Sequence, residues 1–166
     1  MLMSRLLLTA ALLATLGSFS TGVQAVGDDA IKVTSIAEVE TVVTGKDGNK
    51  MRKRSPVQKA VPGTEVIYTT TFKNLIKKPV GNIVIDNPIP NASVYKVGSA
   101  FGKDCDIQFS VDGGKTFGHA EELTIKEADG KTHPALAKEY TNIRWIYKKQ
   151  LAAGKSGEVG FSASIK

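Results

Sequence analysis

Two segments of the chain repeat with a period of two residues, and this pattern constrains the fold more than any other feature of the sequence. They are TEVIYTTTFKN (residues 64–74) and EVGFSASIK (residues 158–166). Successive side chains of a β-strand point to opposite faces, so each segment is predicted to be a strand with one face toward a core. The inward residues are Val66, Tyr68, Thr70 and Phe72 in the first segment and Val159, Phe161, Ala163 and Ile165 in the second.

Shorter segments with the same character fill much of the remaining chain. Strands are predicted within residues 35–45, 82–87, 106–111 and 142–148, and the continuous apolar run in the second of these predicts a strand buried on both sides. Residues 119–140 are predicted to hold two short strands and then a helical turn. Many short strands that are separated by turns are typical of a sandwich or a barrel.

Glycine and proline mark the ends of these strands. Asp47-Gly48 is a strong hairpin signal between the first predicted strand and a basic segment. Pro88 and Pro90 end the strand before them, because proline has no N–H to donate to a ladder. The pattern therefore predicts an all-β domain with antiparallel neighbours.

The N-terminal residues 1–25 are typical of a signal peptide. A single positive residue, Arg5, precedes an apolar run from Leu6 to Leu16, and small and polar residues follow up to Ala25. The apolar run is shorter than the ~20 residues of a spanning helix, so cleavage after Ala25 is favoured over an uncleaved membrane anchor. We expect a signal-peptide helix, a polar lead-in at residues 26–30, and one domain at residues 31–166, exported to the periplasm or the extracellular space without a membrane span.

A set of residues within the domain resembles the DUF11 conserved-repeat domain family. The residues that carry the resemblance are Pro62-Gly63, Tyr68, Asn74, Ile83 to Ile85, Asp86, Pro88, Pro90, Tyr95 and Gly98-Ser99. The closing segment at residues 151–166 is similar to the final turn and strand of that family. The resemblance implies an immunoglobulin-like antiparallel β-sandwich of an exported bacterial or archaeal protein. Many members carry tandem repeats, whereas this chain has one unit.

The segment SVDGGKTF at residues 110–117 is similar to the Asp-box hairpin of sialidases. The residues that match the pattern are Ser110, Asp112, Gly114, Thr116 and Phe117. The motif occurs once, in a chain too short for a propeller of several blades. An aspartate that accepts backbone N–H groups and a pair of glycines also make a good turn without any catalytic role. We therefore interpret the segment as a structural turn.

No other set of residues has the spacing of a catalytic or metal site. Glu121, Glu122, Glu127 and Asp129 offer no evident pair for glycoside hydrolysis. The wide spacing of Cys105, His119 and His133 is unlike that of zinc ligands. We expect no enzymatic activity, no cofactor and no metal. Cys105 is the only cysteine, so it is either a small buried hydrophobic residue, which is the favoured interpretation, or a thiol open to intermolecular pairing.

The main basic cluster is KMRKRS, and its charged members are Lys50, Arg52, Lys53 and Arg54. Lysine and arginine discourage edge pairing, so a solvated strand edge explains the cluster. Attraction to an anionic surface is the alternative. Nucleic acid is not expected, because no aromatic residue lies in the cluster to stack on bases.

Together these features predict a non-enzymatic exported module with a structural or protein-binding role in the cell envelope. Its partner would be an envelope protein or a surface polymer that the sequence does not identify. Two alternatives stay open. One is a carbohydrate-binding or carbohydrate-processing module, and the other is a surface protein that assembles with itself through strand edges or through its thiol.

Overall fold

A computed structural model describes residues 23–24 and 30–166 of the chain. The predicted signal peptide at residues 1–25 lies outside the described residues except for residues 23–24, and so does the predicted cleavage site after Ala25. The described elements are β1 (Val23–Gln24), β2 (Ile31–Thr44), β3 (Lys50–Pro56), β4 (Glu65–Asn74), β5 (Val84–Pro88), β6 (Ser93–Tyr95), β7 (Phe101–Gly102), β8 (Cys105–Ser110), β9 (Thr124–Lys126), β10 (Thr132–Pro134), the 3-10 turn η1 (Ala137–Glu139), β11 (Asn142–Tyr147) and β12 (Ser156–Ile165).

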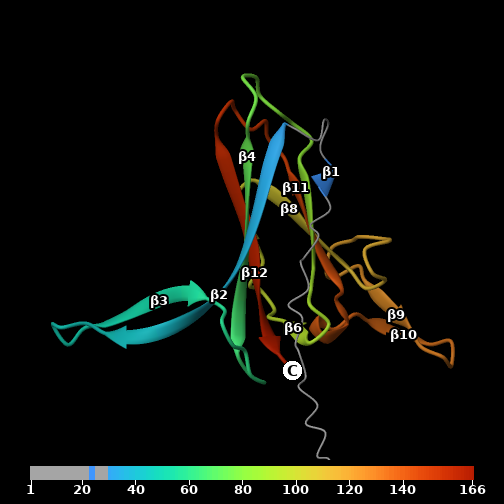
Figure 1. Cartoon of the computed structure of the whole chain (residues 1–166). Helices are drawn as coiled ribbons and strands as arrows, with labels where there is room; N and C mark the ends of the chain where they lie inside the picture. Colours follow the sequence, from blue (N-terminus) through green and yellow to red (C-terminus); the bar gives the residue numbers. More distant parts are fainter. Residues whose placement is uncertain (1–22, 25–29) are drawn as a thin grey trace, which may run out of the picture.

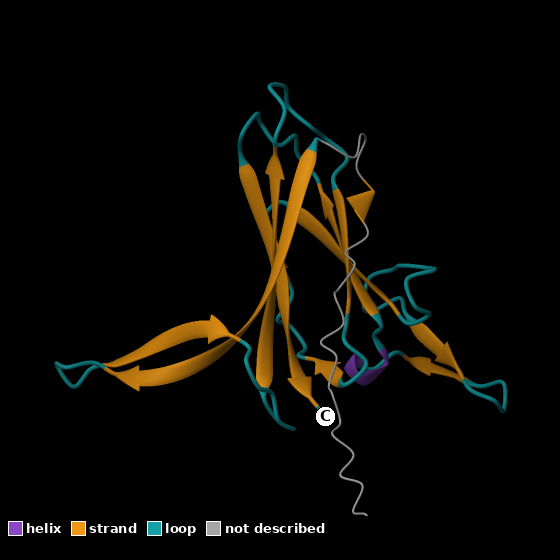
Figure 2. Cartoon of the chain, viewed as in Figure 1, coloured by secondary structure: helices purple, strands orange, loops and turns teal. Residues whose placement is uncertain are grey.

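The strands form two antiparallel sheets that face each other and a separate two-stranded hairpin (Figure 1, Figure 2). The larger sheet has the order β3-β2-β4-β12-β6, with β7 also paired to β12. The smaller sheet has the order β1-β5-β11-β8, and β9 pairs with β10. The predicted all-β antiparallel character is therefore confirmed. No helix among the described residues has the length and apolarity needed to cross a membrane.

One apolar core fills the space between the two sheets. Its centre is the indole of Trp145 on β11, which lies 6.3 Å from the ring of Phe161 on β12. The largest fully buried apolar side chains are Trp145, Phe72, Phe161, Ile83, Ile85, Ile143 and Val159. The predicted inward faces of residues 64–74 and 158–166 supply much of this core.

Two predicted strands differ in detail from their patterns. Residues 83–85 were predicted to be buried on both sides, but Ile83 and Ile85 are buried while Val84 is only partly covered. No described layer covers the outer face of the smaller sheet, so the run alternates. The strand predicted within residues 35–45 begins earlier, at Ile31, and continues well beyond the sandwich.

The far half of β2 forms a projecting arm with β3. β2 pairs with β4 from Ile31 to Glu38 and with β3 from Glu38 to Thr44. We call residues 39–55 the arm. It extends sideways from the sandwich in Figure 1. The predicted Asp47-Gly48 turn closes it, and Gly48 adopts a φ of 78° that favours glycine.

A buried amide at the end of β4 joins three segments of backbone. Asn74 is fully buried, and its Oδ1 accepts the N–H of Ile76 at 3.0 Å. Its Nδ2 donates to the carbonyl oxygens of Lys78 and Leu151, both at 2.8 Å. The amide therefore ties the exit of β4 to the loop between β11 and β12.

Replacement of Asn74 by Ala should lower the free energy of unfolding by about 3 kcal/mol. The change removes three hydrogen bonds and leaves buried backbone groups without partners. Urea denaturation measures the loss. The matched control is Asn91→Ala at an exposed asparagine, for which a change within about 0.5 kcal/mol is expected. Equal effects of the two substitutions would contradict the role of the buried amide.

Candidate functional site

The Asp-box-like segment forms a turn whose polar atoms bond to one another. Asp112 Oδ1 accepts the N–H groups of Lys115 and Thr116 at 3.0 Å each. Its Oδ2 accepts the Thr116 hydroxyl at 2.7 Å. The Ser110 hydroxyl donates to Asp112 at 2.7 Å and accepts the N–H of Gly114 at 2.9 Å. Both carboxylate oxygens are thus engaged within the turn.

The electrostatics of the turn favour the ionised aspartate. The backbone N–H of Thr116, then its hydroxyl and that of Ser110, hold the pKa of Asp112 well below its usual range. The last residue of the pattern, Phe117, packs its ring 3.7 Å from the Arg144 guanidinium carbon. Arg144 also holds Asp86 through two bonds of 2.7 Å. The turn is thereby fastened to the outer face of the smaller sheet.

The four residues of the basic cluster lie on β3 and are all exposed. Arg52 and Arg54 share a face with Glu40 on β2, and their guanidinium nitrogens lie 3.0 and 3.7 Å from its carboxylate oxygens. Lys53 lies on the opposite face of the arm, across from Thr41. The strand is the edge of the larger sheet.

The structure does not bring the acidic and histidine residues singled out in the sequence into one set. His133 lies between Glu127 and Glu139, with its Nε2 3.6 Å from an oxygen of each. His119 lies instead beside Asp106, at 3.7 Å. In the part of the chain that the structure describes, no group of three or more such side chains could hold a metal ion.

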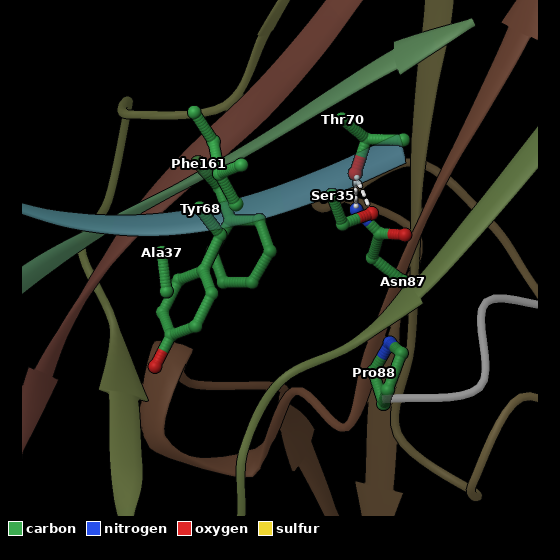
Figure 3. A pocket seen from close by; sticks show the side chains of 8 residues that line it. Ser35, Ala37, Tyr68, Thr70, Asn87, Pro88 and Phe161 are labelled. Carbon is green, nitrogen blue, oxygen red and sulfur yellow. Dashed lines mark hydrogen bonds between the residues drawn. The ribbon is translucent and has the colours of Figure 1, made fainter. Parts of the chain in front are cut away.

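A cleft that was not predicted from the sequence opens at one lateral edge of the sandwich, between the larger and the smaller sheet. It is lined by residues of the larger sheet and of β5, namely Ser35, Ile36, Ala37, Tyr68, Thr70, Asn87, Pro88 and Phe161 (Figure 3). Its walls are mainly apolar. Its polar residues Ser35, Thr70 and Asn87 come from three strands that are distant in sequence. The only local sign of a polar site was a threonine, Thr70, on the predicted inward face of its strand.

The polar residues of the cleft form a short chain of hydrogen bonds between the sheets (Figure 3). The hydroxyl oxygens of Ser35 and Thr70 lie 2.8 Å apart, and Asn87 Nδ2 donates to the Thr70 hydroxyl at 2.8 Å. Thr70 and Asn87 are buried. Asn87 Oδ1 is buried and accepts no hydrogen bond from the described residues. A buried acceptor without a donor costs about 1–3 kcal/mol. Among the described residues, Thr69 Oγ1, Ser93 Oγ and Trp145 Nε1 are likewise buried without a hydrogen-bond partner.

Open strand edges border the cleft on both sides. β3 pairs with β2 only from Glu38 onward, so no described strand lies beside Ile31–Ile36 on that edge. Ala37 directs its carbonyl oxygen to that edge, where the N–H of Val57 donates to it at 3.0 Å. Backbone direction alternates along an antiparallel strand, so Val33 and Ser35 direct their N–H and C=O groups to the same edge. No strand of the described residues pairs with these groups.

The second border of the cleft is β5. Its pairing with β1 involves only Val84 and Ile85, and no described strand lies beside the rest of that edge. Pro88 sits at the mouth of the cleft and has no N–H. In the part of the chain that the structure describes, no strand therefore closes this side of the sandwich at either sheet.

No family model, curated protein or solved structure matches this chain. The resemblance to the DUF11 family thus rests on the residues that carry it, and any function is argued from the geometry of the molecule. In that geometry the cleft combines an apolar lining, a buried amide oxygen and two strand edges beside which no described strand lies.

Cys105 begins β8 and is partly buried against the core. Burial, together with the nearby charge of Asp104, raises the pKa of its thiol to about 11. The thiolate is the reactive form of cysteine, so this environment makes the residue a poor partner for disulfide exchange at neutral pH.

The pH dependence of stability should report the charge of Asp112. A lowered pKa in the folded state stabilises the fold above the ordinary pKa of about 3.9, and this stabilisation is lost as the pH falls through the folded-state value. Asp112→Asn should therefore lower the denaturation midpoint at pH 7, by a difference that shrinks as the pH falls below about 4. Glu158→Gln, which removes an exposed carboxylate outside the turn, is the control. A difference for Asp112→Asn that stays constant between neutral and acid pH would contradict the assignment.

The alkylation rate of Cys105 should be low in the folded protein. A pKa near 11 instead of about 9 lowers the thiolate fraction at pH 8 about 100-fold. Iodoacetamide should therefore label the native protein about 100-fold more slowly than the protein in denaturant, as followed by mass spectrometry. Equal rates, or a disulfide-linked dimer after mild air oxidation, would show an accessible thiol instead.

Proposed function

We propose that this chain is an exported, non-enzymatic module of the immunoglobulin-like β-sandwich type that binds an extended segment of a partner protein in the cell envelope or outside the cell. The signal-like N-terminus, the resemblance to the DUF11 family and the all-β fold support this proposal together. The partner segment would add a strand to the open edge of β2.

The observation that carries the proposal is the side cleft. It combines an apolar lining with backbone edges that no described strand pairs and with the buried Asn87 Oδ1, to which no described group donates. Strand addition uses this combination, because main-chain hydrogen bonds supply affinity and a pocket for alternate side chains supplies specificity. A small molecule would use the pocket but not the edge.

The cleft also defines the chemistry of the bound segment. Its backbone would pair with the N–H and C=O groups of Val33 and Ser35. One apolar side chain would point inward, between Ala37, Tyr68 and Phe161. A polar hydrogen at the neighbouring position would donate to Asn87 Oδ1. Because the mouth of the cleft carries no charged side chain among its lining residues, we expect an uncharged segment.

The carbohydrate alternative has no comparable support. Both oxygens of Asp112 accept hydrogen bonds within their own turn. The carboxylate of the turn is therefore already engaged within the chain.

Selection from a library of displayed linear peptides tests the proposal with a defined probe. Peptides selected on the wild-type protein should bind at least about 10-fold more weakly to Ala37→Phe, whose larger side chain fills the cleft. Thr34→Phe is the matched control, because it adds the same ring to the same strand on its exposed outward side. Its affinity should stay within about twofold of wild type.

A chemical change in the peptide separates strand addition from side-chain binding. Methylation of one backbone nitrogen at a position that faces β2 should abolish binding, whereas methylation of the next nitrogen should not. Peptides that bind Ala37→Phe as tightly as wild type, or a library without binders, would refute the proposal.

A further inference from the structure

The arm is a two-stranded ribbon without a core of its own. Val42 and Met51 are 65% and 54% exposed, although both are large apolar residues on paired strands. An isolated two-stranded hairpin is at best marginally stable in water. The arm would therefore gain stability from a surface that covers one of its faces.

The two faces of the arm differ in charge. Residues directly opposite each other in the ladder share a face, so Glu40 lies with Arg54 on one face, and Arg52 follows on the same face. The other face carries Val39, Thr41, Val43, Met51, Lys53 and Ser55. We call these six residues the apolar-basic face. It has three apolar side chains, one cation and no carboxylate.

The opposite side of the molecule carries the reverse charge. The β9–β10 hairpin and the turn after it project away from the side that carries the arm (Figure 1, Figure 2). Residues 121–139 contain five acidic and three basic residues, whereas the arm contains five basic and two acidic residues. We call residues 121–139 the acidic end.

The acidic end has an open cleft of complementary chemistry. The cleft is lined by Glu127, His133, Pro134, Leu136, Lys138 and Glu139. Leu136 is 51% exposed, so an apolar side chain lies beside the carboxylates of Glu127 and Glu139. This surface matches an incoming face that presents an apolar residue and a cation, as Met51 and Lys53 do.

We propose that copies of this chain assemble head to tail, with the apolar-basic face of one arm on the acidic end of the next copy. Met51 would cover Leu136, and Lys53 would meet Glu127 and Glu139. The occupant is a second copy because the two complementary surfaces belong to one chain and lie on opposite sides of it. A contact between two different surfaces leaves one of each free at the ends, so the assembly grows until the rotation between copies closes a ring, or stays open where it does not close.

This assembly goes beyond the proposed peptide binding and uses other residues. The side cleft of Ser35 and Asn87 takes no part in it, so Ala37→Phe should leave assembly unchanged. Loss of peptide binding and loss of assembly are therefore separate outcomes.

Sedimentation velocity of the purified exported protein at low and high salt tests the assembly. At an ionic strength of about 0.01 M, the wild type should form a concentration-dependent series of oligomers, and at about 1 M salt it should be monomeric. Lys53→Glu and Glu127→Lys should each weaken the association at least about 10-fold. Lys59→Glu makes the same charge change at an exposed position outside the arm and should leave the association unchanged.

Mixing the two variants gives the decisive result. The arm of Glu127→Lys meets the intact acidic end of Lys53→Glu, and the exchanged charges at the other contact also attract, so an equimolar mixture should regain growth although each variant alone stays monomeric. The double variant that carries both substitutions should regain growth, because the charges are exchanged across the contact.

Three results would overturn the proposal. They are a monomeric wild type at low salt, a mixture that stays monomeric, and oligomers that Lys53→Glu leaves intact. A monomeric wild type that binds dextran sulfate through Lys53 would assign the arm to an anionic polymer instead.

Discussion

The pairing of β12 with β4 is the interaction on which the rest of the fold depends. The ladder runs from Ser156 opposite Lys73 to Ser164 opposite Glu65, and β12 also pairs with β6 and β7. Two glycines of β12, Gly157 and Gly160, permit the close approach of its neighbours. A Cβ at Gly157 would overlap the Phe72 ring, and one at Gly160 would overlap the backbone of β4 and the Phe101 ring. The last strand of the chain therefore completes the core, so folding requires contacts between distant parts of the sequence.

The parts of the fold that were predictable from the sequence are those that local patterns determine. The hydrogen bonds of Asn74 show which contacts a local pattern predicts and which it does not. An asparagine at a strand exit commonly accepts a hydrogen bond from the backbone two residues on, as Asn74 does from the N–H of Ile76. Its bond to Leu151 joins residues 77 positions apart and has no local signature. The two short strands around Asp129-Gly130 and the helical turn after them were likewise predicted, because turn residues and short spacing define them.

The arm shows why a correct strand prediction does not give its surroundings. The period of two in residues 35–45 is the same whether a face packs on a core or lies in water, so the point at which β2 leaves the sandwich at Glu38 is not visible in the pattern. The basic residues of β3 did indicate an exposed edge. The sequence does not indicate that the neighbouring apolar residues Val42 and Met51 are also exposed. Their exposure depends on how far the smaller sheet extends alongside the larger one.

The side cleft was unpredictable for a different physical reason. Ser35, Thr70 and Asn87 each look like ordinary polar residues of a strand, and only the approach of the two sheets brings them together. A sandwich can satisfy a buried polar chain internally, as Asn74 does, or leave its last atom without a partner, as Asn87 does. The first arrangement stabilises the isolated chain. The second lowers its stability, and this cost would be recovered if the proposed partner segment donated a hydrogen bond to the atom.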